Sequence, residues 1–149
     1  MLETCLSCQI VSGQQTTLGD VIAETAFFHA HQDFAYPVPG LVIVASKRHF
    51  NCLDEFTEEE AGDFIHFTIE IRKAQRQVLD VRHVYYFYNE DTRHHFHLWM
   101  VPRYGWMEAF GRSVDALRPA LVHARDTMNS PRELAHVAAV AKALSEQLK

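Results

Sequence analysis

Residues 95–103 read HFHLWMVPR, a run in which histidine and tryptophan alternate with apolar residues. This alternation predicts a β-strand, because successive side chains of a strand point to opposite faces of its sheet. His95, His97 and Trp99 would then share one face, while the apolar residues between them share the other. Neighbours on one face lie ~6.6 Å apart, twice the rise per residue. The two imidazoles can therefore do separate jobs, one binding a metal and the other reacting.

The rest of the chain predicts an α+β domain around this strand. Thr57 and Glu60 form a capping box at the start of a predicted helix spanning residues 57–79. A second capping box at Ser130, followed by proline, starts a helix that closes the domain. The order of strands and helices fits one antiparallel sheet rather than repeated βαβ units. Apolar and β-branched runs predict five strands, at residues 21–23, 27–31, 41–45, 84–88 and 96–101.

Length and composition predict one globular domain over residues 1–149. Apolar residues make up 48% of the chain and charged residues 22%, as in ordinary globular proteins. No run approaches the ~20 apolar residues of a membrane span, and the N-terminus lacks the pattern of a signal peptide, so we expect a cytoplasmic protein. The net charge of −5 argues against a protein that coats nucleic acid, but it leaves room for a small anionic ligand.

Cys5 and Cys8 form a Cys-x-x-Cys pair near the N-terminus. Three cysteines cannot all pair within one chain, and in a reducing compartment this pair indicates a metal site or a redox-active site. A structural zinc ion prefers four nitrogen and sulfur ligands in a tetrahedron, and such a pair supplies two of them from one turn. A thioredoxin-like motif would need a βαβ context, which this chain lacks. The pair alone leaves both interpretations open.

Two segments, GLVIVASKRH at residues 40–49 and HFHLWMVPR at residues 95–103, resemble the histidine triad family of nucleotide hydrolases and transferases. The family pattern is His-x-His-x-His, followed by two hydrophobic residues and commonly Pro-Arg. The resemblance covers roughly residues 5–105. It implies a histidine-triad-like fold with a central and a C-terminal helix, a nucleotide-derived ligand and a homodimer.

The Pro-Arg pair at residues 102–103 sets the register of this resemblance. With that pair aligned, His95, His97 and Trp99 fill the three triad positions. The competing register places Arg93 first and leaves the Pro-Arg pair one residue out of step, so we reject it.

The resemblance implies a structural zinc site beside a reactive histidine. In many bacterial members the zinc ligands are a Cys-x-x-Cys pair, a later histidine and the first triad histidine. His97 would be the nucleophile, which attacks the α-phosphorus of a nucleotide and forms a nucleotidyl-histidine. A hydrogen bond to its far ring nitrogen must then fix its tautomer. The implied zinc ligands are Cys5, Cys8, His49 and His95.

The same resemblance implies further substrate contacts. Asn89 and Thr92 occupy positions where the family binds phosphate, and Asp33 occupies one where members often bind the ribose hydroxyls. Trp99 replaces the third histidine, which contacts phosphate and assists the leaving group. An indole can donate one hydrogen bond or stack on a base, but it has no titratable proton to transfer. An aromatic residue that simply fills the strand face is the alternative for Trp99, and a surface aspartate is the alternative for Asp33.

Other departures concern the short loop before the triad and a third cysteine. The loop at residues 89–95 lacks the glycines common in the family, and Arg93 and His94 either compensate by charge or are merely solvated. Cys52 lies three residues after His49 and is either a competing zinc ligand or a partly buried thiol.

Three functions remain open at this point. The first is a nucleotidyl hydrolase or transferase that cleaves a phosphoanhydride or phosphoramidate through His97. The second, motivated by Trp99, is a zinc-stabilised nucleotide-binding or interaction module that has lost catalysis. The third is a catalytic metal with an open coordination position, against which a set of four protein ligands argues.

Overall fold

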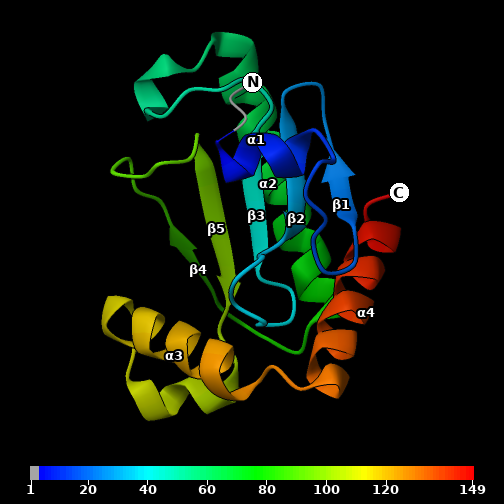
Figure 1. The fold of residues 1–149 in the computed structure, drawn as a ribbon, viewed down its shortest axis with the longest axis vertical. Coiled ribbons are helices and arrows are strands. Elements are labelled where there is room, and N and C mark those ends of the chain that lie inside the picture. Colours follow the sequence, from blue (N-terminus) through cyan, green and yellow to red (C-terminus); the bar gives the residue numbers. More distant parts are fainter. Residues whose placement is uncertain (1–3) are drawn as a thin grey trace.

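A five-stranded antiparallel sheet forms the centre of the structure, a computed structural model that describes residues 4–149 (Figure 1). The first three residues of the predicted domain lie outside the described residues. The strand order is β1-β2-β3-β5-β4, which confirms the predicted α+β class and its single antiparallel sheet. The strands are β1 (Val21–Glu24), β2 (Phe28–Gln32), β3 (Val42–Ser46), β4 (Val84–Phe87) and β5 (His97–Pro102).

Helices cover the two faces of this sheet unequally. Two long helices, α2 and α4, pack together against one face, whereas the short α1 crosses the opposite face (Figure 1). Helix α3 and the 3-10 turn η2 pack on each other at the end of the sheet remote from α1. The helical elements are α1 (Leu6–Val11), η1 (Leu53–Glu55), α2 (Glu58–Val78), η2 (Gly105–Phe110), α3 (Val114–Thr127) and α4 (Pro131–Gln147).

Both predicted capping boxes are present. The Thr57 hydroxyl accepts a hydrogen bond from the Glu60 amide at 3.1 Å, and the Thr57 amide donates to the Glu60 carboxylate at 2.9 Å. Ser130 and Glu133 make the same reciprocal pair at the start of α4. Each box satisfies amides that the first helical turn leaves without partners, and this fixes where α2 and α4 begin.

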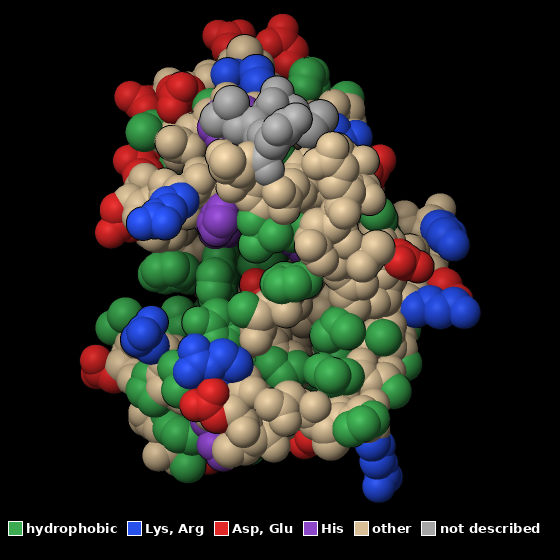
Figure 2. All heavy atoms as spheres, viewed as in Figure 1, with side chains coloured by type: hydrophobic (Ala, Val, Ile, Leu, Met, Phe, Trp, Pro, Cys, Tyr) green, Lys and Arg blue, Asp and Glu red, His purple; other side chains and the backbone are tan. Residues whose placement is uncertain are grey.

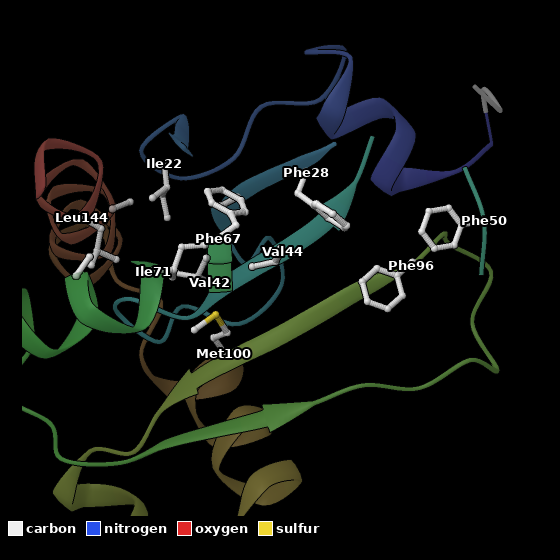
Figure 3. Packing of buried hydrophobic residues seen from close by; sticks show 13 residues of the cluster. Ile22, Phe28, Val42, Val44, Phe50, Phe67, Ile71, Phe96, Met100 and Leu144 are labelled. Carbon is white, nitrogen blue, oxygen red and sulfur yellow. The ribbon is translucent and has the colours of Figure 1, made fainter. Parts of the chain in front are cut away.

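The larger core cluster lies between the sheet and the two long helices. Its aromatic end surrounds Phe96, which is 2% exposed and stacks on Phe50 with ring centroids 5.7 Å apart (Figure 3). The Phe56 ring meets Phe96 edge-on at 4.8 Å. Such packing holds the residue between His95 and His97 in a fixed position.

A turn with a glycine leads into β3. Gly40 has φ 75°, a conformation that side chains disfavour, and an added Cβ would lie 2.7 Å from Leu79 Cδ1. The buried Gln32 side chain donates to the Val38 carbonyl at 2.9 Å and accepts from the Gly40 amide at 3.1 Å. From α2, Gln75 donates to the Gly40 carbonyl at 3.0 Å. These bonds tie the loop that follows β2 to the core.

Three features differ from the sequence prediction. Helices α1 and α3 were not predicted; α1 has only six residues, and α3 contains Pro119, a residue that usually ends a helix. The predicted strand 96–101 begins at His97, because the Phe96 amide donates to the Phe50 carbonyl in the loop after β3. His95 therefore precedes the strand rather than lying within it.

Across residues 4–149, every helix is too short or too polar to cross a lipid bilayer.

Candidate functional site

Four side chains from three parts of the chain converge beside α1. Cys5 and Cys8 come from the start of this helix, His49 from the loop after β3, and His95 from the residues just before β5. Their candidate ligand atoms all lie within 4.8 Å of one another. Cys8 Sγ is 3.2 Å from His95 Nδ1 and 3.3 Å from His49 Nδ1, and Cys5 Sγ is 3.7 Å from His95 Nδ1.

These separations fit a tetrahedral zinc ion. Ligands bound at the usual Zn–S and Zn–N lengths lie roughly 3.5 Å apart across a tetrahedral angle, which is close to the observed sulfur–nitrogen distances. Burial, aided by the neighbouring His49, lowers the pKa of His95 to about 4, so this imidazole is neutral and its Nδ1 can carry a lone pair for a metal. The cluster therefore fits a structural zinc site with ligands Cys5, Cys8, His49 and His95.

The third cysteine lies apart from this cluster. Cys52 caps η1, and its thiol is not among the atoms that converge. Desolvation and the carboxylates of Glu90, Glu55 and Asp54 raise the pKa of the Cys52 thiol, which disfavours the thiolate that a metal needs. The part of the chain that the structure describes thus offers one four-ligand set without Cys52.

A cavity of about 260 Å³ opens on the same face of the sheet as this cluster. It is lined by α1, β2 and the loop after β2, together with His94, His97 and Trp99. Figure 2 shows the corresponding hollow below α1, with hydrophobic side chains on its floor and a histidine at its rim. The structure thereby brings Asp33, His97 and Trp99 to one cavity.

His97 is held in one tautomer. Its Nδ1 lies 2.9 Å from the His95 carbonyl oxygen, which can only accept, so Nδ1 must carry the proton and donate it. Burial lowers the pKa of His97, and the ring is neutral near pH 7. The remaining nitrogen, Nε2, then has a lone pair available for attack on an electrophile.

Trp99 lies next to His97 within an aromatic group. Its ring centroid is 6.3 Å from that of His97, 5.6 Å from Tyr36 and 5.8 Å from Phe87. The indole Nε1 is buried and has no hydrogen-bond partner among residues 4–149. A buried donor without a partner is costly, so Trp99 is suited to donate to an acceptor on a ligand.

Asp33 lines the same cavity as His97 and lies directly after β2. One carboxylate oxygen accepts hydrogen bonds from the Ala35 amide at 2.9 Å and the Tyr36 amide at 2.7 Å. Burial raises the pKa of Asp33 to about 6, although these amide bonds oppose the shift. This carboxylate is therefore a buried acceptor on the cavity wall rather than a surface aspartate.

Two other candidate residues do not line the cavity. Asn89 donates to the Asp91 carboxylate at 2.7 Å, and the Thr92 hydroxyl accepts from the His94 amide at 3.2 Å. Both lie in the loop between β4 and β5, so their phosphate contacts stay a prediction. Arg93, in the same loop, is exposed, whereas the His94 ring lies 6.3 Å from that of His97.

Sequence reasoning missed two buried histidines of β2. His29 and His31 point to the face that carries the cavity, and His31 lines it. The sequence does place these histidines with Asp33, since residues 29, 31 and 33 alternate along one strand and must share a face. Their burial could not be read from the pattern, because it depends on α1, which was not predicted.

No protein-family model matches the chain. Among curated proteins, the Bacillus subtilis protein named "Protein hit" is 26% identical over 114 residues, which cover 73% of this chain and 77% of that protein.

Solved structures share the fold at low sequence identity. A zinc-bound histidine triad family protein from Mycobacterium smegmatis is 23% identical with a TM-score of 0.69, covering 97% of this chain and 95% of that one. A HIT family member from Bacillus subtilis is 22% identical with a TM-score of 0.64, covering 92% and 94%. A hypothetical histidine triad nucleotide-binding protein from Sulfolobus tokodaii is 18% identical with a TM-score of 0.69, covering 97% and 91%.

The zinc assignment predicts a defined metal content. We expect one zinc ion per chain in the purified protein, and its loss in Cys5→Ser, because three ligands hold the ion far less tightly than four. Because zinc binds the folded state, its loss should lower the melting temperature by about 10 °C. Elemental analysis and thermal unfolding measure both effects.

Cys52→Ser is the matched control, since it removes a thiol outside the cluster. It should keep one zinc ion per chain and a melting temperature near that of the wild type. Zinc loss in Cys52→Ser, or full zinc content in Cys5→Ser, would contradict the assignment.

Proposed function

We propose that this chain, which has the histidine triad fold, is a nucleotide-binding hydrolase or nucleotidyl transferase. The observation that carries this proposal is the neutral imidazole of His97, whose Nδ1–H is held by the His95 carbonyl at the edge of a cavity. A nucleophile needs a free lone pair at a fixed position, and this hydrogen bond leaves one on Nε2. The fit of the fold to structures of nucleotide-binding proteins supports a nucleotide as the ligand.

In the proposed reaction, His97 Nε2 attacks the α-phosphorus of the bound nucleotide. A P–N bond forms as the bond from phosphorus to the leaving group breaks, and the leaving group departs with the electron pair of that bond. Water or another acceptor then attacks the same phosphorus and loses a proton to the solvent. The P–N bond breaks, its electron pair returns to Nε2, and the nucleoside monophosphate or its ester leaves neutral His97. The covalent intermediate replaces one hard displacement by two easier ones.

The other cavity residues have matching roles in binding. Trp99 Nε1–H is a donor for a phosphate oxygen, and the Asp33 carboxylate is an acceptor for a sugar hydroxyl. Trp99 cannot protonate a leaving group. A phosphoanhydride, which expels a phosphate that needs no proton, therefore suits this site better than a substrate with a basic leaving group.

The zinc site contributes to this reaction only through the backbone. When bound, zinc would hold His95, whose carbonyl fixes the tautomer of His97. All four ligand positions are filled by protein side chains, which leaves no open position for a metal-bound water. This argues against the metal as the catalyst.

The nucleophile predicts a selective loss of turnover. In His97→Ala, release of nucleoside monophosphate from a dinucleoside polyphosphate should fall by about a thousandfold or more, because no other group replaces the attacking nitrogen. Zinc content should stay at one ion per chain, since His97 is not a ligand. A product assay and elemental analysis of the same sample test both points.

His136→Ala, which removes an exposed histidine of α4 far from the cavity, is the control and should keep wild-type turnover. Unchanged turnover in His97→Ala would overturn the proposed mechanism.

The second candidate is a nucleotide-binding or interaction module without catalysis, favoured by the tryptophan at the third triad position. Nucleotides would then raise the melting temperature of the wild type while no product forms. The product assay, run with the same nucleotides, separates the two functions.

We also propose a homodimer that pairs β4 and α2 of two copies. In the described sheet β4 pairs only with β5, so its outer edge offers free backbone donors and acceptors. Beside this edge, a groove of about 430 Å³ lies between α2 and β4. Its walls include exposed Ile65, Ile69 and Tyr86. Apolar side chains that are this exposed in a single copy indicate a surface that a partner covers.

The charges along α2 favour a second copy of the chain over another partner. The first turn carries Glu58 and Glu59, whereas the groove wall near the other end carries Arg72, Lys73 and Arg76. Two antiparallel copies of α2 that meet at Ile65 and Ile69 would place each acidic end against a basic end. We also propose a cytoplasmic setting, because Cys5 and Cys8 must be free thiols to bind zinc and a reducing compartment keeps thiols free.

The dimer predicts a change in mass. Ile65→Glu combined with Ile69→Glu should convert a dimer into monomers, because it places four like charges at the centre of the proposed interface. Light scattering after size exclusion measures the mass. The control is Val114→Glu on the exposed start of α3, which should stay dimeric. A monomeric wild type, or a double variant that remains dimeric, would rule out this interface.

A further inference from the structure

Two histidines of β2 form a buried pair that the proposed reaction does not use. His29 is 1% exposed and His31 is 3% exposed, and their Nδ1 atoms lie 3.2 Å apart. Burial lowers the pKa of both rings, that of His31 to about 3, so both are neutral. A neutral imidazole has one donor nitrogen and one acceptor nitrogen. One Nδ1 must therefore donate a hydrogen to the other.

Glu24 decides which ring is the donor. Its carboxylate faces His29 Nε2 at 3.7 Å, and a negative charge favours a hydrogen on the nitrogen that it faces. Lys47 approaches the other carboxylate oxygen at 3.5 Å and weakens this effect. Glu24 nevertheless raises the pKa of His29 more than Lys47 lowers it. With its hydrogen on Nε2, His29 accepts at Nδ1. His31 then donates from Nδ1, and its Nε2 keeps a lone pair.

The strand register places His31 beside the expected path of the ligand. Across β3, His97 lies in the row of Ala45 and His29, whereas His31 lies in the row of Ile43 and Trp99. Adjacent rows on one face are ~6.6 Å apart along the strands. His31 lines the cavity at this distance from the His97 row. With an α-phosphorus at His97, we expect the sugar of the same nucleotide near the row of His31.

We propose that His31 Nε2 accepts a hydrogen bond from a sugar hydroxyl of the bound nucleotide, and that His29 and Glu24 hold His31 in the tautomer that this requires. The proposal rests on the proposed nucleotide-binding function. It makes His31 a specificity-determining residue, distinct from Asp33, which lies just past the end of β2. A nucleotide that lacks this hydroxyl leaves a buried acceptor without a donor, which weakens binding roughly tenfold.

The tautomer is tested first, without a ligand, by long-range proton–nitrogen correlation of the histidine rings in the zinc-loaded protein. The His31 signals are assigned by their absence from His31→Phe. We expect a protonated Nδ1 and an unprotonated Nε2 in His31, with the reverse in His29. In Glu24→Gln, which removes the charge that orients the pair, the mirrored tautomer should appear. A protonated Nε2 in wild-type His31, or spectra of Glu24→Gln identical to the wild type, would overturn the proposal.

Binding is tested by calorimetry with AMP, 2′-deoxy-AMP and 3′-deoxy-AMP. The wild type should bind at least one deoxy analogue roughly tenfold more weakly than AMP, and His31→Phe, which keeps an aromatic ring, should lose that preference. If His31→Phe does not fold, His31→Asn replaces it; its amide oxygen accepts, so it should retain part of the preference. An unchanged ratio in His31→Phe, or no preference in the wild type, refutes the hydroxyl contact.

Two further outcomes are distinguishable. If the wild type binds none of the three nucleotides, the proposed function fails and the hydroxyl contact fails with it, although the tautomer result stands by itself.

A 3.2 Å separation of the His29 and His31 Nδ1 atoms also suits two ligands of one metal ion. Two zinc ions per chain, falling to one in His31→Phe, would therefore replace the hydrogen-bonded pair with a second metal site.

Discussion

The hydrogen bond from His97 Nδ1 to the His95 carbonyl joins the two halves of the site. His95 takes part twice, since its side chain belongs to the metal cluster and its backbone orients the neighbouring imidazole. Any force that fixes the His95 backbone thus fixes the lone pair on His97. A zinc ion bound here would act as scaffolding, and its influence on the proposed reaction would pass through one carbonyl group.

Packing on the other side of the chain completes this constraint. Between the two histidines, Phe96 points into the aromatic core on the opposite face, its amide donates to the Phe50 carbonyl at 2.6 Å, and its carbonyl accepts from the Ser46 amide at 3.2 Å. The aromatic core therefore fixes residues 95–97 on one face of the sheet, while the metal cluster fixes them on the opposite face. His49 directly precedes Phe50, and His95 directly precedes Phe96. The hydrogen bond between Phe96 and Phe50 therefore ties together the two segments that carry these histidines.

Much of this arrangement could be predicted from the sequence because it depends on local rules. Alternation placed His97 and Trp99 on one face, and capping boxes placed the starts of α2 and α4. The cluster residues, including His49 from a distant segment, were implied by the resemblance to the histidine triad family rather than by a local rule. What could not be predicted depends on tertiary contacts. The burial of His29 and His31 requires α1 above them, and the exclusion of Asn89 from the cavity wall follows from the path of an irregular loop.

A crystal structure of the zinc-loaded protein soaked with AMP tests the central claim most directly. We expect one metal ion bound by Cys5, Cys8, His49 and His95, and a separate phosphate whose phosphorus faces His97 Nε2 in the cavity. A phosphate bound to the metal, or a metal with a water in place of one of the four protein ligands, would contradict it, because the metal would then belong to the chemistry rather than to the scaffold.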